Sequence, residues 1–173
     1  MGNLMADHIP AKAGSRAWLF DTRASKWTVL IRLLVGLVVF LPEGIQKLFF
    51  PEILGAGRFA HIGIPYPEFM GPFVGIVEAA CGALIIVGFL TRLASVPLIA
   101  IMIVAIVSTK VPILLGRPFW IFSLPDLKRY GFWSMQHEAR ADFCMLLGSI
   151  HLLIVGSGPW SLDAWWPRRP RHD

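Results

Sequence analysis

The sequence predicts an all-α membrane protein built as a bundle of four transmembrane helices. Composition is the first reason: of 173 residues, 55% are hydrophobic and 16% are charged, whereas a soluble domain carries about 25% charged residues. The apolar residues also gather in four long stretches, each long enough as a helix to cross a bilayer core of about 30 Å. The chain length fits one compact bundle without a second domain. These observations exclude an ordinary soluble fold.

The first predicted span covers residues 27–50, and we expect it to be bent. As a helix it would be about 36 Å long, longer than the bilayer core, so it should tilt or kink. Pro42 offers a place for the kink because proline removes a backbone donor. The connection that follows, 51–68, is rich in Gly and Pro and ends in Ile-Pro-Tyr-Pro-Glu, which cannot be a continuous helix.

The second and third predicted spans cover 69–90 and 93–115. Only Thr91 and Arg92 separate them, so we expect a tight antiparallel hairpin. The connection after the third span, 116–136, is rich in aromatic residues, which in membrane proteins usually lie at the level of the lipid headgroups. The fourth predicted span, 137–155, is the least apolar because its first turns carry charge.

The second span has a small residue at every fourth position. These residues are Gly71, Gly75, Ala79 and Ala83. In lipid, such a row lets two helices approach closely. We interpret it as packing within the bundle, and a homo-oligomer formed through this face is the alternative.

Basic residues predict the orientation of the chain. Lys and Arg near membrane spans favour the cytoplasmic side, and this rule explains the net charge of +5 without a nucleic-acid partner. With the N-terminus inside, the cytoplasmic side holds Lys12, Arg16, Arg23, Lys26, Arg92, Arg168, Arg169 and Arg171, and the outer side holds Arg58, Arg117, Lys128 and Arg129. We therefore expect a bacterial cytoplasmic (inner) membrane protein with a cytoplasmic arm (1–26), a transmembrane domain (27–157) and a basic cytoplasmic tail (158–173).

Several charged residues fall inside the spans, and this orientation puts most of them in the outer half of the membrane. A charge turned toward lipid costs about 2.5–3.5 kcal/mol even on the lenient insertion scale. We therefore expect a polar pocket formed by Glu43, Lys47, Glu78, Lys110 and Asp142. The alternative is that Glu43 and Lys47 simply pair at i, i+4, while Lys47 and Lys110 extend toward the headgroups. Glu78 lies near the middle of its span and is too deep for that.

Three further charged residues are secondary candidates. Arg32 shares a helical face with Glu43 and Lys47, within about 60°, but lies in the inner half. Glu138 is on the same stripe of the fourth span as the pocket aspartate. Arg140 points almost opposite to that stripe, so we do not expect it to pair with Asp142.

The two cysteines complete the list of candidates. Cys81 and Cys144 are far apart, form no CxxC motif and lie in apolar runs, where a buried thiol mostly packs as a small hydrophobe. His137 and His151 would be about 21 Å apart along one helix. They cannot share an ion within that helix, and no metal site is predicted.

At these residues the chain resembles the DoxX family of small bacterial membrane proteins. The stretches that carry the resemblance are 32–47 (RLLVGLVVFLPEGIQK), 77–94 (VEAACGALIIVGFLTRLA) and 158–164 (GPWSLDA). The resemblance implies a four-helix membrane protein and marks Arg32, Lys47, Glu78 and Arg92 as family-like positions without a shared catalytic set. It also implies redox work, since one branch resembles a subunit of a thiosulfate:quinone oxidoreductase and another is associated with oxidative-stress complexes.

Our leading hypothesis is a redox-associated component whose outer-half pocket takes a quinone head group or a small anion. No GxGxxG, CxxCH or haem-spaced histidine pair identifies a resident cofactor, so the electrons would come from a quinone or from a soluble or membrane redox partner protein. Two alternatives remain open: a non-enzymatic scaffold for soluble partners, and a small-solute or proton transporter. Whether the chain is itself an enzyme is left open by the sequence.

Overall fold

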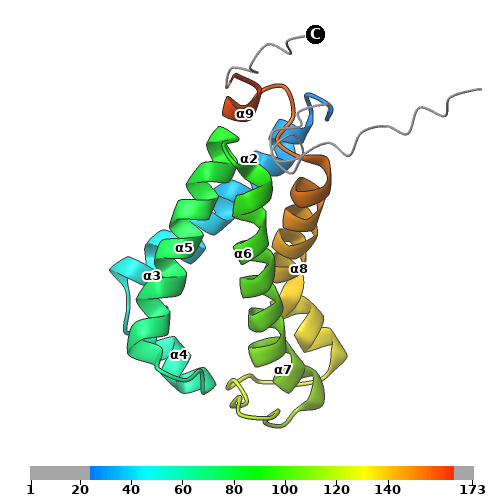
Figure 1. The fold of residues 1–173 in the computed structure, drawn as a ribbon. Helices are drawn as coiled ribbons and strands as arrows, with labels where there is room; N and C mark the ends of the chain where they lie inside the picture. The colour runs from blue at the N-terminus through cyan, green and yellow to red at the C-terminus, as the bar shows by residue number, and fades with distance from the viewer. Residues whose placement is uncertain (1–23, 166–173) are drawn as a thin grey trace, which may run out of the picture.

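The computed structural model describes residues 24–165 (Figure 1). Almost all of the predicted N-terminal arm and the three arginines of the predicted basic tail lie outside the described residues. Within this range the chain is helical and has no strand, apart from one isolated bridge between Phe119 and Phe122. The all-α prediction is therefore confirmed for the described part of the chain.

The elements follow one another along the chain as α- and π-helical segments. They are α2 (Thr28–Val38), η1 (Val39–Ile45), α3 (Gln46–Phe49), α4 (Ala56–Ile62), α5 (Pro67–Val87), α6 (Thr91–Ala105), η2 (Ile106–Lys110), α7 (Val111–Leu115), α8 (Phe132–Val155) and α9 (Leu162–Trp165). Three continuous helical runs are long and apolar enough to cross a membrane: Thr28–Phe49, Pro67–Val87 and Thr91–Leu115. They correspond to the first three predicted spans; α8 is long but does not meet that criterion of apolarity.

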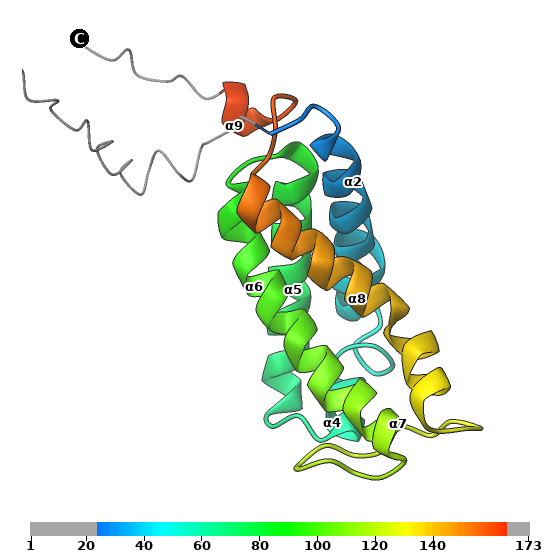
Figure 2. The same ribbon diagram turned by 90° about the vertical axis from the view of Figure 1, so that its right-hand side faces the viewer.

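The long helices pack into a bundle that opens toward one end. The most extensive contact is between α5 and η1, and α6 packs on α8. Figure 2 shows α8 lying across α6 and α2. In Figure 1, α5 and α6 lie side by side at their connecting hairpin and diverge toward α4 and α7. We call these two ends the hairpin end (residues 88–92 and 156–165) and the cavity end (residues 43–78 and 105–142).

The apolar core lies nearer the hairpin end than the cavity end. Its buried members come from all four long helices: Val35, Val39, Cys81, Ile85, Ala94, Leu98, Met102, Met145 and Leu152. The row of small residues on α5 allows the first helix to pack closely, since a Cβ built at Gly75 would lie 3.0 Å from Cδ2 of Leu48. Likewise, a Cβ at Gly44 would lie 2.5 Å from the nitrogen of Ala79. The row therefore packs within the bundle.

Two of the predicted boundaries were wrong. The chain turns at residues 88–90 rather than at Thr91 and Arg92, because Gly88 adopts a left-handed conformation (φ +71°) that ends α5. The fourth helix begins at Phe132, five residues before the predicted start. The predicted start was based on the apolar run, and the helix continues beyond it. The connection 51–68 is not a continuous helix, as predicted. It contains the short helix α4, which was not predicted because the segment is rich in Gly and Pro.

Both π-helical segments lie at the cavity end beside a proline. Pro42 is inside η1, where a kink was expected, and the widened turn there also contains Glu43. The segment η2 ends at Lys110, and Pro112 follows in α7. A proline cannot donate to the preceding turn, and π-bulges are frequent at functional sites. Each segment turns a charged residue toward the space between α5 and α6.

Candidate functional site

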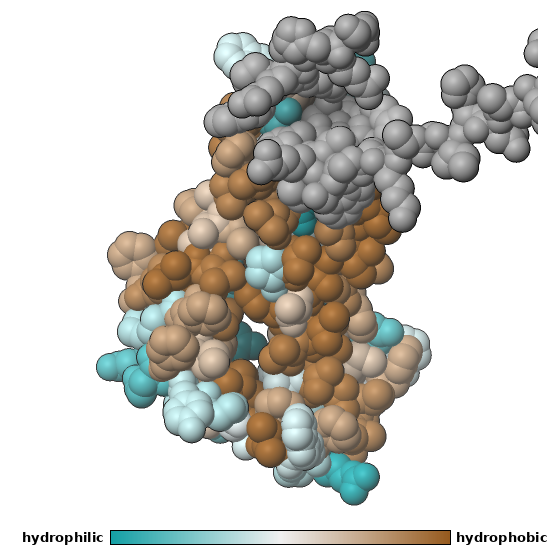
Figure 3. Space-filling view, viewed as in Figure 1, coloured by the Kyte–Doolittle hydropathy of each residue, from teal (hydrophilic) through white to brown (hydrophobic). Residues whose placement is uncertain are grey.

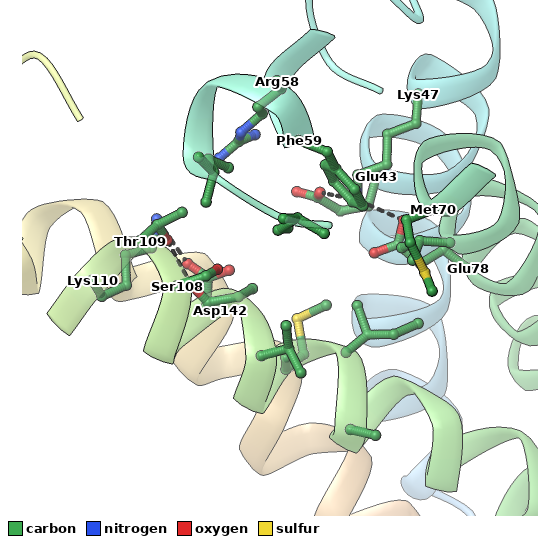
Figure 4. A pocket seen from close by; sticks show the side chains of 18 of the residues that line it. Glu43, Lys47, Arg58, Phe59, Met70, Glu78, Ser108, Thr109, Lys110 and Asp142 are labelled. Carbon is green, nitrogen blue, oxygen red and sulfur yellow. Dashed lines mark hydrogen bonds and ion pairs between the residues drawn. The ribbon is translucent and has the colours of Figure 1, made fainter. Parts of the chain in front are cut away.

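A cavity of about 440 Å³ lies between the diverging parts of α5 and α6, within the range of small-molecule sites. Figure 4 shows that α4 covers one side of it. Its apolar lining comes from α4 to α6, α8 and the loop after α4: Phe59, Ile62, Ile64, Met70, Val74, Ala100, Ile101, Met102, Val104, Ala105 and Ala141. The polar lining is confined to a few side chains and includes all five predicted pocket residues.

Three of those residues form a charged triad on one wall, in which Glu43 is half-buried. The Nζ atom of Lys47 lies 3.1 Å from Oε2 of Glu43 and 2.6 Å from Oε2 of Glu78. Lys47 and Glu78 are buried, and Glu78 has no exposed surface at all. The i, i+4 pair of the first helix is thus present, but the lysine also bridges to α5. It does not extend away from the bundle.

The other two residues form an ion pair on the opposite wall. Nζ of Lys110 lies 3.2 Å from Oδ2 of Asp142, which joins η2 to α8. Figure 4 shows this pair facing the triad across the cavity. Beside it, Ser108 and Thr109 donate their hydroxyl hydrogens to the backbone oxygen of Ala105 (3.4 and 2.6 Å), so both hydroxyls are engaged within their own helix.

One atom of the triad has no partner. Oε1 of Glu78 is buried and accepts no hydrogen bond from any described residue. In Figure 4 the Glu78 carboxylate lies in the cavity wall beside the side chains of Glu43 and Met70. Buried polar atoms in native proteins nearly always have partners, and leaving an acceptor unsatisfied costs about 1–3 kcal/mol. This oxygen is therefore the most unusual atom of the wall.

The rim of the cavity contains a residue that the sequence reasoning missed. Arg58 of α4 lines the cavity and extends along its covered side (Figure 4). A smaller cavity of about 130 Å³ adjoins it and shares Arg58, Lys110 and Glu138 in its lining, together with loop residues such as Ser123. Arg58 was treated only as a loop charge because α4 was not predicted. The apolar residues Phe59 and Ile62 beside it were the available signal for a helix.

The structure does not bring every candidate to the cavity. Glu138 lines its rim, whereas Arg140 is exposed and contacts the ring of His137 at 3.0 Å. Asp142 pairs with Lys110 instead. Cys81 packs in the core and does not line the cavity. The packing expected for Cys144 is wrong, because this side chain faces outward from α8.

Arg32 lies at the hairpin end rather than with Glu43 and Lys47. Its guanidinium donates to the backbone oxygens of Ile85 (2.9 Å) and Ile86 (2.7 Å), and also to those of Ser157 and Trp160. The difference in depth predicted between Arg32 and the pair of Glu43 and Lys47 is thus observed, since some 15 residues at about 1.5 Å each separate Arg32 from Lys47 along the helix. Arg32 therefore caps the C-terminal end of α5 by donating to its last backbone oxygens.

Two more residues of the hairpin end bind backbone groups in the same way. Arg92 donates to the oxygen of Ile154 at 3.0 Å, near the C-terminal end of α8. The carboxylate of Asp163 accepts from the nitrogens of Leu90 (2.8 Å) and Thr91 (3.4 Å) at the start of α6. Residues 158–165, which were assigned to the tail, therefore contact the bundle. Within residues 24–165, no group of His, Cys, Asp or Glu side chains is arranged to hold a metal ion.

Fold and cavity together describe a multi-pass membrane protein with charged groups around an intramembrane space. The family model of DoxX matches residues 27–111, and the chain belongs to the DoxX family. It is 52% identical over 135 residues to "Uncharacterized membrane protein Rv3486" of Mycobacterium tuberculosis, covering 78% of each chain. It is 30% identical over 137 residues to "Putative oxidoreductase CatD" of Bacillus subtilis, covering 79% of this chain and 84% of the relative. No solved structure matches the chain.

Proposed function

We propose that the protein is a redox-associated component of the bacterial cytoplasmic membrane that binds the head group of a lipid-soluble quinone in the cavity. The observation that carries this proposal is the triad of Glu43, Lys47 and Glu78 facing a mostly apolar cavity of ligand size. Small-molecule sites combine apolar walls with a few polar groups that orient the ligand. The name of the Bacillus subtilis relative supports an oxidoreductase class.

The position of the cavity favours a ligand that arrives from the bilayer. Figure 3 shows the molecule hollowed between α5 and α6, with apolar surface around the opening. Met70 and Val74 of α5 and Val104 of α6 belong to the apolar lining of the cavity. An apolar ring and tail can enter here without crossing water, whereas a small anion has no comparable reason to approach through lipid.

The triad is better explained by binding than by stability. Taking charges out of water is costly, and a buried ion pair is often replaced by apolar side chains with little or no loss of stability. Lys47 also carries three N–H donors, and its two carboxylate partners occupy two of them. The third can serve a ligand oxygen.

We also propose that α8 is a fourth membrane span and that both termini are cytoplasmic. The helix has 24 residues, or about 36 Å of length, and it packs along α6 and α2. Its charge at Asp142 is neutralised by Lys110, while Leu147 and Ile154 are exposed, as expected for side chains that face lipid. Cysteine-labelling accessibility from each side of the membrane, with single cysteines at Ser25 and Ser134, tests the orientation.

The transporter alternative finds less support in the geometry. A transporter needs a polar route to both faces, but the apolar core of Val35, Ile85, Leu98 and Leu152 lies between the cavity and the hairpin end. The polar groups of the hairpin end bind backbone atoms. The scaffold alternative relies on the basic termini, which lie largely outside the described residues, and on the wide connection 116–136, which does not contribute to the charged triad.

Saturable binding of a short-chain quinone to the purified protein in nanodiscs tests the proposal. We expect Val74→Trp, which fills the cavity from its apolar side without changing a charge, to weaken binding by about tenfold or more. Val96→Trp is the matched control, because Val96 is exposed on α6 and does not line the cavity. Absence of saturable binding by the unmodified protein would reject the proposed function.

A further inference from the structure

The unpartnered oxygen of Glu78 constrains which ligand the cavity can accept. One oxygen of this carboxylate, Oε2, accepts a hydrogen bond from Nζ of Lys47 at 2.6 Å, and this bond holds the carboxylate in place. The other, Oε1, is buried and has no donor among the described residues. A carboxylate oxygen in an ion pair is an acceptor only. A well-fitting ligand must therefore present an O–H or N–H group at this point.

The walls of the cavity do not supply that donor themselves. The hydroxyls of Ser108 and Thr109 both donate to the backbone oxygen of Ala105. Lys110 is paired with Asp142 on the opposite wall. Near Glu78, the uncharged lining consists of apolar side chains such as Met70 and Ile101. Arg58 also lines the cavity but donates no hydrogen bond to Oε1 of Glu78. The site thus has acceptor capacity that a ligand can satisfy.

The oxidised and reduced forms of a quinone differ in this property. A quinone carbonyl is an acceptor only, and placing it against a carboxylate oxygen leaves both atoms without a donor. A quinol carries hydroxyl groups, each of which can donate to a carboxylate oxygen in a charge-assisted bond. The ring and the tail are otherwise almost the same, so the apolar walls cannot distinguish the two forms.

We propose that the cavity selects a lipid-soluble aromatic diol, the quinol rather than the quinone, and that one of its hydroxyl groups donates to Oε1 of Glu78. This inference rests on the proposed function and specifies the ligand of the same site. The head group lies between the triad and the pair of Lys110 and Asp142, and the tail extends between α5 and α6 into the bilayer. Lys47 positions the carboxylate, and its remaining N–H group is directed to the same head group.

The test compares the binding of both redox forms to the full chain in nanodiscs, without oxygen. The probes are decylubiquinol, decylubiquinone and the dimethyl ether of decylubiquinol, which keeps the aromatic ring but has no hydroxyl donor. We expect the quinol to bind about tenfold more tightly than either other probe, the loss typical of one buried hydrogen bond to a charged group. The dimethyl ether makes this comparison independent of any variant.

A pair of isosteric variants locates the effect. Glu78→Gln keeps the size of the side chain but adds an amide donor, so we expect the preference for quinol to fall to less than about twofold or to reverse. Glu68→Gln is the matched control, because Glu68 is an exposed residue in the first turn of the same helix and does not line the cavity. It should retain the preference of the unmodified protein.

The outcomes separate this inference from the proposed function. Binding of neither form to the unmodified protein would reject the proposed function itself. Equal binding of the three probes, or tighter binding of the quinone, would overturn the selectivity while leaving the site as a quinone site. A preference for quinol that persists in Glu78→Gln would overturn the role of Glu78. If Glu78→Gln fails to fold, Glu78→Asp, which keeps an acceptor, must preserve the sign of the preference.

Discussion

At the hairpin end of the bundle the buried charges bind backbone atoms, whereas at the cavity end they bind one another. Arg32 donates to oxygens at the end of α5, and Asp163 accepts from nitrogens at the start of α6. Lys47 and Lys110 instead pair with carboxylates from other helices around an open space. Helix ends always leave backbone groups that need partners. A buried charge that supplies such a partner has a structural explanation, and one that lines a cavity does not.

The largest effect on the free energy of unfolding is expected at Arg32. Arg32→Met should lower the free energy of unfolding by about 3 kcal/mol or more, because several buried carbonyl oxygens lose their donor at once. Denaturation of the detergent-solubilised protein followed by circular dichroism measures this. Arg117→Met, an exposed position in the connection after α7, is the control. A loss below about 1 kcal/mol would show that Arg32 is not a structural residue.

A smaller loss is expected at the other residue of the hairpin end. Asp163→Asn retains one acceptor oxygen but loses the charge at the start of α6, and helix caps of this kind contribute about 1 kcal/mol. We expect a similar decrease in the free energy of unfolding and no change in quinol affinity. Reduced quinol affinity in Asp163→Asn would contradict the assignment of a purely structural role to the hairpin end.

The triad should show the opposite pattern. Replacing Lys47 and Glu78 together by Met removes a buried ion pair and fills its volume with apolar groups, so stability should change by less than about 1 kcal/mol. Quinol affinity should fall by about tenfold or more. Parallel unfolding and binding titrations on this double variant give both numbers. A large loss of stability with retained affinity would reassign the triad to the structure of the bundle.

The smallest effect is expected at Arg140. Its side chain is exposed and contacts only His137 among the described residues. Arg140→Gln should therefore change stability by less than about 0.5 kcal/mol and leave quinol affinity unaltered, as is usual for surface substitutions. An altered affinity would mean that this side of α8 contributes to the site.

The fold and the charged residues were predictable from sequence to different extents. Apolar runs of bilayer length predicted the first three spans, and the cost of charge in lipid correctly pointed to Glu78, Lys47 and Lys110 as buried. The group that each buried charge binds was harder to predict from the sequence. A depth count along the helix separated Arg32 from Lys47, but it gave no sign of the backbone oxygens that Arg32 binds. Arg58 was missed because a Gly- and Pro-rich connection conceals a short helix.

The π-helical turns explain part of this difficulty. Each contains or adjoins a proline, and a widened turn shifts the face on which later residues lie. Glu43 and Lys110 both belong to such turns. Sequence periodicity gives no sign of the shift, but a proline within one or two residues of an intramembrane charge does mark the place where it occurs.

Infrared difference spectroscopy shows whether the carboxylate of Glu78 binds a ligand in the cavity. Adding decylubiquinol to the protein in nanodiscs should shift a carboxylate stretching band, because Oε1 gains a hydrogen bond. We expect this shift to disappear in Glu78→Gln and to persist in Glu68→Gln. The same difference spectrum in both variants would show that the quinol acts on some other carboxylate and that Glu78 does not bind it.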